Sequence, residues 1–175
     1  METMKTKFPE ITRDYLETLQ INIGYKCNQA CSHCHVDAGP GRTEMMSDKI
    51  INLIPKVIKA NNIKMLDITG GAPELHPKFK QLVSEVRRLN VEVMDRCNLT
   101  ILTEAGHENL AYFLASNKVQ ITASLPCYLK DNVDKQRGKG VFEKSILALK
   151  QLNSYGYGIK AVSYTHLTLP TILRV

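Results

Sequence analysis

The chain has 175 residues, of which 43% are hydrophobic and 23% charged, a composition typical of a soluble globular protein of about one domain. Its longest apolar stretches fall well short of the roughly 18–20 residues that a membrane span needs, and no signal-peptide core is present, so we expect a cytoplasmic protein without membrane contact. The net charge of +6 comes from lysines and arginines scattered among acids, which makes nucleic acid an unfavoured partner. Five cysteines in such a protein indicate metal or redox chemistry rather than disulfides.

Strand and helix patterns alternate from the N-terminal part onward. Apolar and polar residues alternate over Thr18–Ile23, which predicts a strand that ends at Gly24. Ser47 is a good N-cap, and apolar residues recur at helical spacing from Ile50 to Ile58. Pro55 lies inside this pattern, so we expect the helix to bend there or to start later.

The same alternation continues through the rest of the chain. Further strands are predicted at Met65–Thr69, Val91–Cys97, Val119–Leu125 and Gly158–Val162. Helical stripes lie between them, at Phe79–Leu89, Leu110–Leu114 and Phe142–Leu152. Strands that alternate with helices through short connections pair in parallel, so the sequence predicts an α/β architecture.

A distinctive segment follows each of the first four predicted strands. Cysteines follow the first strand, Gly70 and Gly71 the second, Asn98 the third, and Ser124 ends the fourth. The carboxyl ends of parallel strands meet at one edge of the sheet, where function gathers in α/β folds. We therefore expect these segments to form one site.

Cys27, Cys31 and Cys34 are spaced C-x3-C-x2-C directly after the first predicted strand. A closed zinc site and a fully protein-ligated iron–sulfur cluster both need four ligands, so three thiols leave one coordination position open. An open position is where substrate or cofactor chemistry takes place. The alternative is a zinc knuckle that is completed by His33 or His35.

This triplet resembles that of the radical S-adenosylmethionine (SAM) enzymes. In that family three cysteines hold a [4Fe–4S] cluster, the fourth iron binds SAM, and reduction cleaves SAM to methionine and a 5′-deoxyadenosyl radical. The resemblance implies a parallel (β/α) barrel of the radical SAM type. Because the sequence predicts four strand–helix units and only part of a fifth strand, the α/β fold that we expect is an incomplete barrel, truncated in the fifth strand. The resemblance also implies a small-molecule substrate and an electron donor such as flavodoxin or ferredoxin.

Thr69–Pro73 resembles the family's Gly-Gly-Glu-Pro segment, whose backbone meets the amino group of SAM. The resemblance assigns this backbone role to Gly70 and Gly71, and glycines suit close approach to a ligand. Ala72 stands where the family has glutamate, and Glu74 comes two residues later, so the resemblance assigns no role to Glu74.

The family resemblance also implies SAM-binding roles for individual residues elsewhere in the chain. His33 occupies the position of an aromatic residue near the adenine, with a solvent-facing histidine as the alternative. Asn98 lies where many members have Thr-Asn-Gly after the third strand. Ser124 and Arg137 resemble the serine and arginine that contact the ribose and carboxylate of SAM. The alternative for Arg137 is an ordinary surface residue.

Four segments together resemble the radical SAM proteins of arsenosugar biosynthesis, also called the radical SAM/Cys-rich family. They are Cys27–Pro40, Arg42–Met46, Asp95–Thr100 and Ser124–Tyr128. The implied reaction transfers the 5′-deoxyadenosyl group to a methylated arsenical. The alternatives are a radical SAM enzyme acting on a peptide or another small metabolite, and a non-catalytic metal-binding or scaffold protein.

Cys97 and Cys127 fall at the ends of the third and fourth predicted strands. Trivalent arsenic is thiophilic, so the resemblance makes these two thiols candidate catalytic residues that handle the substrate. The alternatives are ligands of a further cluster and small buried residues of the core.

The end of the chain has an unusual sequence. Val162–Thr171 closely resembles the translation of a sequencing adapter, with a genuine strand and turn as the alternative. We therefore expect residues 1–161 to be a partial radical SAM core and residues 162–175 to be non-native. An open sheet edge invites aggregation, so we expect the chain alone to be poorly stable and inactive.

Overall fold

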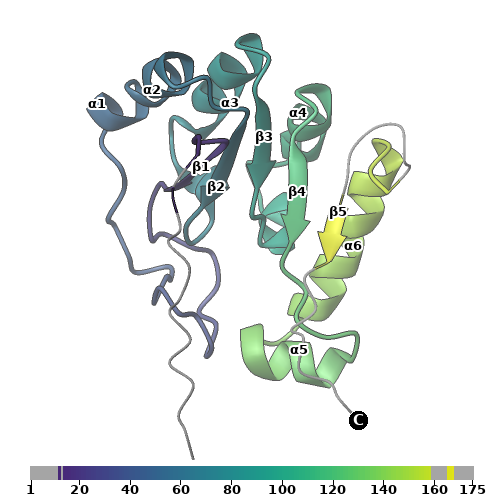
Figure 1. Cartoon of the computed structure of the whole chain (residues 1–175). Coiled ribbons are helices and arrows are strands. Elements are labelled where there is room, and N and C mark those ends of the chain that lie inside the picture. The colour runs from purple at the N-terminus through teal and green to yellow at the C-terminus, as the bar shows by residue number, and fades with distance from the viewer. Residues whose placement is uncertain (1–11, 13, 159–164, 168–175) are drawn as a thin grey trace, which may run out of the picture.

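The computed structural model describes residues 12, 14–158 and 165–167 (Figure 1). Five strands form one sheet in the order β1-β2-β3-β4-β5, and every neighbouring pair is parallel. The strands are β1 (Thr18–Asn22), β2 (Met65–Thr69), β3 (Glu92–Asp95), β4 (Gln120–Ala123) and β5 (Thr165–Leu167). This sequential order is that of a barrel sheet rather than a doubly wound sheet, in which the order reverses.

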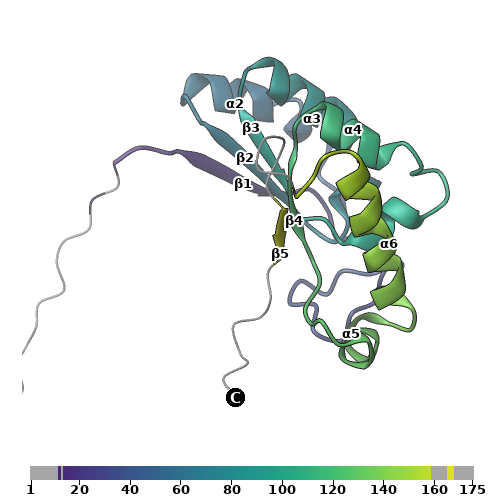
Figure 2. The same cartoon turned by 90° about the vertical axis from the view of Figure 1, so that its right-hand side faces the viewer.

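Helices α2, α3, α4 and α6 lie on one side of the sheet (Figure 2). The helices are α1 (Asp48–Ile51), α2 (Ile54–Ala60), α3 (Phe79–Arg88), α4 (Leu110–Ser116), α5 (Lys130–Arg137) and α6 (Val141–Ser154). Two short 3-10 turns, η1 (Pro73–Leu75) and η2 (Leu99–Thr103), follow the second and third strands. Right-handed crossovers between sequential parallel strands place the connecting helices on the same face.

The two faces of the sheet differ in chemistry because side chains alternate along each strand. The face that packs against the helices is apolar: Leu66, Ile68, Val93 and Ile121 are fully buried. They form one core with helix residues such as Leu82, Val86, Leu114 and Leu152. The opposite face carries polar side chains, and this face holds the site described below.

The α/β fold predicted from the sequence is confirmed, with differences in detail. As expected from Pro55, the helical stretch from Ile50 to Ile58 is interrupted: the chain breaks at Asn52–Leu53, and Pro55 lies in the first turn of α2. Helix α5 was not predicted. Its only buried side chains are Val133 and Arg137, so it has no apolar stripe to reveal it.

The fifth predicted strand, Gly158–Val162, lies mostly outside the described residues. The described β5 begins at Thr165 and pairs with Ile121–Ala123 of β4. Apart from β5, the suspected adapter sequence at 162–175 also lies outside the described residues. The division at residue 161 therefore stays a prediction.

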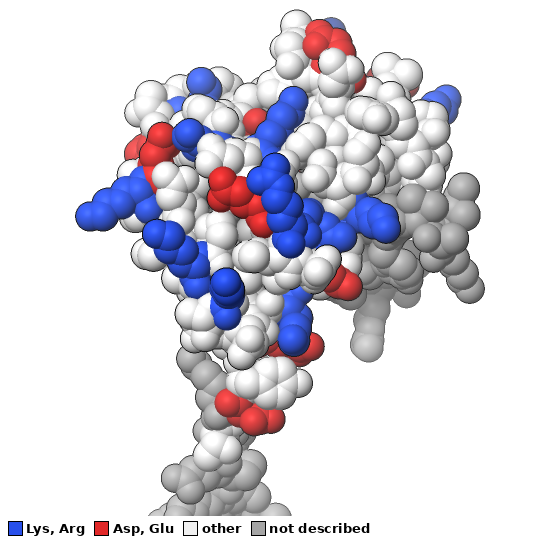
Figure 3. Space-filling view, turned by 90° about the horizontal axis from the view of Figure 1, so that it is seen from above, with Lys and Arg blue, Asp and Glu red and all other residues white. Residues whose placement is uncertain are grey.

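Figure 3 looks onto the end of the molecule where the strands begin, and shows lysines and arginines interspersed with acids there. Several cations are paired, including Lys78 with Asp48 at 4.0 Å. Within the described part of the chain, no helix is both long enough and apolar enough to cross a membrane.

Candidate cofactor site

A pocket of about 740 Å³ lies at the carboxyl ends of β1 to β4. Most residues that the sequence singled out line this pocket. They are Cys27, Cys31, His33, Cys34, Gly70, Gly71, Asn98, Ser124 and Arg137. The edge of the sheet therefore brings together segments that are more than 100 residues apart in the chain.

The cysteine loop is a folded element held by main-chain hydrogen bonds. The Cys27 amide donates to the Gly39 carbonyl at 3.1 Å, and the Gly39 amide donates to Tyr25 at 3.1 Å. A further bond, from the Cys34 amide to the Cys31 carbonyl at 3.2 Å, closes a turn between the last two cysteines. These bonds fix the loop's shape, so the thiols are positioned by the backbone.

Gly70 and Gly71 allow β2 to approach this loop closely. A Cβ atom on Gly70 would lie 2.6 Å from the Gly24 carbonyl oxygen, and one on Gly71 would lie 2.5 Å from that of Lys26. In this arrangement the Gly71 amide donates to Gly24 at 2.9 Å. The glycines are thus required by the packing of the cysteine loop, while both also line the pocket.

Protein N–H groups point at two of the three cysteine sulfurs. The Sγ of Cys27 accepts from the Gln29 amide at 3.4 Å and from Asn98 Nδ2 at 3.2 Å. The Sγ of Cys34 accepts from the Ala38 amide at 3.2 Å. Burial raises the pKa of the Cys27 thiol, and the two hydrogen bonds to its sulfur oppose that rise. Such donors stabilise a thiolate that ligates iron.

The thiol of Cys31 lies near a cation. Burial is the largest influence and raises its pKa, while the charge of Arg137 acts in the opposite direction. Soft thiolates beside N–H donors and a guanidinium match the ligand chemistry of an iron–sulfur cluster.

The spacing of ligand atoms favours a cluster over a single zinc ion. Ligands of one tetrahedral zinc ion lie about 3.8 Å apart, given a Zn–S bond of about 2.3 Å. In the described part of the chain, the only set of three ligand atoms mutually within 4.8 Å belongs to Glu74, Asp95 and Cys97. The loop cysteines and histidines are therefore not gathered around a single-ion position.

Gln29, which the sequence analysis did not single out, is the centre of a buried hydrogen-bond network. Its Oε1 accepts from Arg137 Nε at 3.1 Å and Nη2 at 2.8 Å, and its Nε2 donates to Thr100 Oγ1 at 2.8 Å. Thr100 in turn donates to Asn98 Oδ1 at 2.9 Å. In the sequence, Gln29 is marked only by its place as a polar residue between the first two cysteines.

Arg137 lies at the C-terminal end of α5 and is buried. Besides Gln29, it donates from Nη1 to the main-chain oxygen of Ser124. The prediction placed Arg137 and Ser124 at one site, and the structure brings them together through the backbone of Ser124. His33 and His35 are exposed at the pocket.

The structure does not bring Cys97 or Cys127 into the pocket. Cys97 is fully buried beside Asp95 and Glu74, on the helix side of the sheet, because the neighbouring Arg96 takes the pocket side. The Sγ of Cys127 accepts from the Leu129 amide at 3.3 Å, and this bond lowers the thiol's pKa. The position of a residue after a strand predicts the edge of the sheet at which it lies, but not which face of the sheet its side chain takes.

The site and the fold define a class of protein. A family model described as the radical SAM superfamily matches residues 21–173, and the chain belongs to this superfamily. Its members use a [4Fe–4S] cluster and SAM, so the predicted cofactors are those of the family.

Curated relatives show more particular likenesses. The chain is 27% identical over 142 residues to a probable GTP 3′,8-cyclase of Saccharolobus solfataricus, covering 81% of this chain and 45% of the relative. It is 29% identical over 135 residues to the mycofactocin maturase MftC of Mycolicibacterium smegmatis, covering 77% and 34%. The chain thus spans less than half the length of either relative.

Solved structures share the fold. SuiB of Streptococcus suis bound to S-adenosylmethionine matches with a TM-score of 0.67 and 17% identity, over 81% of this chain and 32% of that protein. The protein anSMEcpe with bound AdoMet matches with a TM-score of 0.65 and 22% identity, over 81% and 41%. These likenesses confirm the α/β fold of the radical SAM type.

Proposed function

We propose that this chain carries the cofactor site of a radical SAM enzyme, with Cys27, Cys31 and Cys34 as the three ligands of a [4Fe–4S] cluster. When bound, the cluster supplies the electron for cleavage of SAM to a 5′-deoxyadenosyl radical. The observation that carries this proposal is the donor set: three thiols line one pocket, N–H groups point at two of the sulfurs, and no single-ion geometry gathers them.

The chain's own residues would bind and orient SAM around that cluster. The backbone at Gly70 and Gly71 would meet its amino group, and Ser124 its ribose. Arg137 would attract the carboxylate, because its guanidinium lines the pocket and is oriented by its bonds to Gln29 and to the Ser124 backbone.

Two further residues complete the proposed SAM site. Asn98 would act mainly through Cys27, since its amide already donates to that sulfur. The exposed ring of His33 would stack near the adenine.

We further propose that the substrate is a methylated arsenical, to which the 5′-deoxyadenosyl group is transferred in arsenosugar biosynthesis. The support is the resemblance of the four segments, which span the cysteine loop and the ends of β3 and β4. Both thiols belong to the buried core, but Cys127 keeps 7% exposure, follows Pro126, which lines the pocket, and has a pKa that hydrogen bonds lower. Cys127 is therefore the better candidate for a substrate thiol. Cys97 faces the core, and its burial argues against that role.

The second candidate is a radical SAM enzyme that acts on a peptide or another small metabolite. A solved relative of the fold, SuiB, is bound to its precursor peptide, and MftC is named a maturase. A flavodoxin or ferredoxin would supply the electron in either case.

Anaerobic reconstitution with iron and sulfide tests the cofactor assignment. We expect about four irons per chain, and loss of iron in the Cys27→Ala, Cys31→Ala and Cys34→Ala variants. A stoichiometric zinc ion in place of iron would support a non-catalytic metal-binding protein instead. Release of 5′-deoxyadenosine tests for SAM cleavage or for reaction with a peptide, whereas formation of a 5′-deoxyadenosyl arsenical tests the arsenical substrate. Both products are best measured on a homologue of the relatives' full length.

A further inference from the structure

We propose that Arg96, held in place by Asp67 and Gln20, forms an anion-binding subsite for the substrate within the same pocket. The inference rests on the proposed function, because it assigns a substrate class to that site. The class is a small oxyanion, such as an arsinate, a phosphinate or a carboxylate.

Strand alternation places these three side chains on the polar face of the sheet. Gln20 and Asp67 are register partners on β1 and β2. Arg96 follows β3 directly, and its amide continues the sheet by donating to the Ile68 carbonyl at 3.0 Å. Gln20 and Arg96 line the pocket, and Asp67 supports them without lining it.

The guanidinium of Arg96 has a fixed orientation. Its Nε donates to Asp67 Oδ1 at 2.9 Å and its Nη2 to Oδ2 at 2.8 Å, a two-point contact with the carboxylate. Gln20 Nε2 donates to Asp67 Oδ2 at 2.6 Å and so fixes the carboxylate. Among the described residues, none accepts a hydrogen bond from Arg96 Nη1. A ligand in the pocket would therefore meet an oriented N–H group with little reorganisation.

The two charged side chains of the Arg96–Asp67 ion pair differ in solvent exposure. The Arg96 side chain is 43% exposed, whereas that of Asp67 is only 8% exposed. Burial by itself raises the pKa of Asp67, but the hydrogen bonds from Arg96 and Gln20 outweigh it and the pKa is lowered. The hydrogen bond to Asp67 raises the pKa of Arg96. Both groups are thus charged at neutral pH, and the cation is the one that a ligand reaches.

The charge of the pocket lining also favours an anion. Arg96 and Arg137 both line the pocket, and no aspartate or glutamate is among the described residues that do so. An anion would gain a charge-assisted hydrogen bond from Arg96 there, which a cation of the same size cannot accept.

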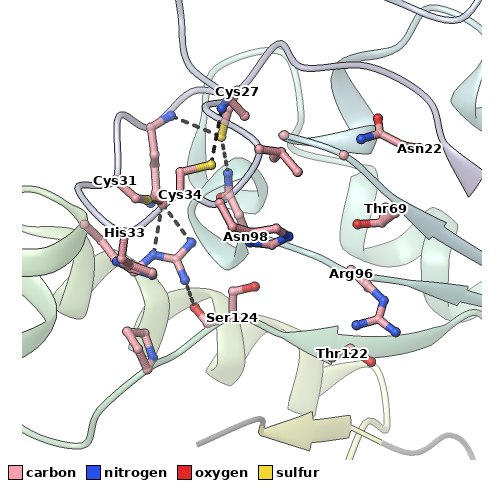
Figure 4. A pocket seen from close by; sticks show the side chains of 18 of the residues that line it. Asn22, Cys27, Cys31, His33, Cys34, Thr69, Arg96, Asn98, Thr122 and Ser124 are labelled. Atoms are coloured by element: carbon pink, nitrogen blue, oxygen red, sulfur yellow. Dashed lines mark hydrogen bonds between the residues drawn. The ribbon is translucent and has the colours of Figure 1, made fainter. Parts of the chain in front are cut away.

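Arg96 lies apart from the cluster ligands. In Figure 4 the labelled cysteines are on one side of the pocket, and Arg96, Thr69 and Thr122 are on the other. Arg137 is on the cysteine side, through its bonds to Gln29. SAM bound near the cysteines would therefore leave Arg96 for a second ligand.

Calorimetric titrations of the reconstituted, SAM-bound chain at pH 8 test this proposal. The probes are dimethylarsinate, dimethylphosphinate as an anion of similar shape without arsenic, and trimethylarsine oxide as an uncharged analogue. We expect one or both anions to bind, and the uncharged oxide to bind at least tenfold more weakly. Equal affinity for the oxide, or no binding of either anion, overturns the proposal. Binding of both anions indicates a general oxyanion subsite, and binding of dimethylarsinate alone indicates one selective for arsenic.

Variants of Arg96 provide the decisive comparison. Loss of a charge-assisted hydrogen bond should weaken anion binding roughly tenfold in Arg96→Gln, with a smaller loss in Arg96→Lys, which keeps the charge. Arg88→Gln, an exposed arginine at the end of α3, is the matched control and should bind like the parent chain. Thermal unfolding checks that each variant is folded. If Arg96→Gln does not fold, the comparison is made with Arg96→Lys.

Two further results would overturn the inference and leave the proposed function intact. Unchanged anion affinity in a folded Arg96 variant removes the residue from the subsite. Loss of SAM binding in that variant assigns Arg96 to the cofactor instead. If the parent chain takes up no iron, the proposed function itself is contradicted. Failure of the cluster assignment can therefore be distinguished from failure of the Arg96 subsite.

Discussion

Asn98 Nδ2 lies 3.2 Å from the sulfur of Cys27 and donates a hydrogen bond to it, although the two residues are 71 positions apart in the chain. The same amide nitrogen donates to Asn28 Oδ1 at 2.7 Å, and Asn98 Oδ1 accepts from Thr100. Asn98, three residues beyond the end of β3, therefore contacts the first cysteine of the loop directly.

Removal of this hydrogen bond should change the redox properties of the cluster. N–H donors to a ligating sulfur raise the reduction potential, so Asn98→Ala should lower it, by on the order of 20–60 mV for one bond. An EPR-monitored redox titration measures the shift. The exposed Asn109→Ala is the control, and an unchanged potential in Asn98→Ala would show that the bond does not influence the cluster.

Substitution of Gln29 should destabilise the fold. In Gln29→Ala the buried guanidinium of Arg137 loses its acceptor and Thr100 loses a donor, so the free energy of unfolding should fall by about 1–3 kcal/mol. Urea unfolding of the metal-free chain measures this change. Gln81→Ala, on the exposed face of α3, should stay within about 0.5 kcal/mol. Equal free energies of unfolding for Gln29→Ala and Gln81→Ala would show that the hydrogen-bond network of Gln29 does not stabilise the fold.

A methyl group at Gly71 should disturb the cysteine loop. The Cβ of Gly71→Ala would lie 2.5 Å from the Lys26 carbonyl oxygen, so the loop must move, at a cost of about 1–3 kcal/mol. We expect lower stability and reduced iron uptake. Gly41→Ala, where nothing lies within 4 Å, is the matched control. Full iron loading and parental stability in Gly71→Ala would show that the close approach is not required.

The stability of the chain should decrease as the pH rises, because Glu74 and Asp95 form a buried carboxyl pair. Burial raises both pKa values, and for Asp95 the charge of Glu74 adds to the rise. The folded chain therefore holds protons that the unfolded chain releases above about pH 4, and this stabilisation is lost as the pH rises toward the folded-state pKa.

Urea unfolding of the metal-free chain at pH 5 and pH 8 measures that decrease. Asp95→Asn should reduce the difference between the two pH values, whereas the exposed Asp131→Asn should not. If the free energy of unfolding changes equally between pH 5 and pH 8 in the parent chain and in Asp95→Asn, the carboxyl pair does not cause the pH dependence.

The sequence predicted the order of strands and helices because apolar periodicity records which face of each element is buried. It also predicted the edge of the sheet at which Cys27, Gly70, Asn98 and Ser124 meet, since parallel strands all end there. It could not predict which face a residue after a strand would take. Cys97 was expected at the site and faces the core, whereas Arg96 takes the pocket side.

Contacts between side chains distant in sequence were also not predictable. The bonds of Gln29 to Arg137 and of Gln20 to Asp67 depend on how the cysteine loop and the strands come together in space. No periodic pattern marks such polar residues, because they satisfy one another instead of forming an apolar stripe.

The three thiols of the loop leave an open coordination position on a [4Fe–4S] cluster, and we propose that SAM fills it. The most direct test is the EPR spectrum of the reduced, reconstituted chain with and without saturating SAM. We predict that SAM changes the g-values of the cluster signal, because it binds the iron that lacks a cysteine. A cluster spectrum that is unaltered by saturating SAM would contradict the claim.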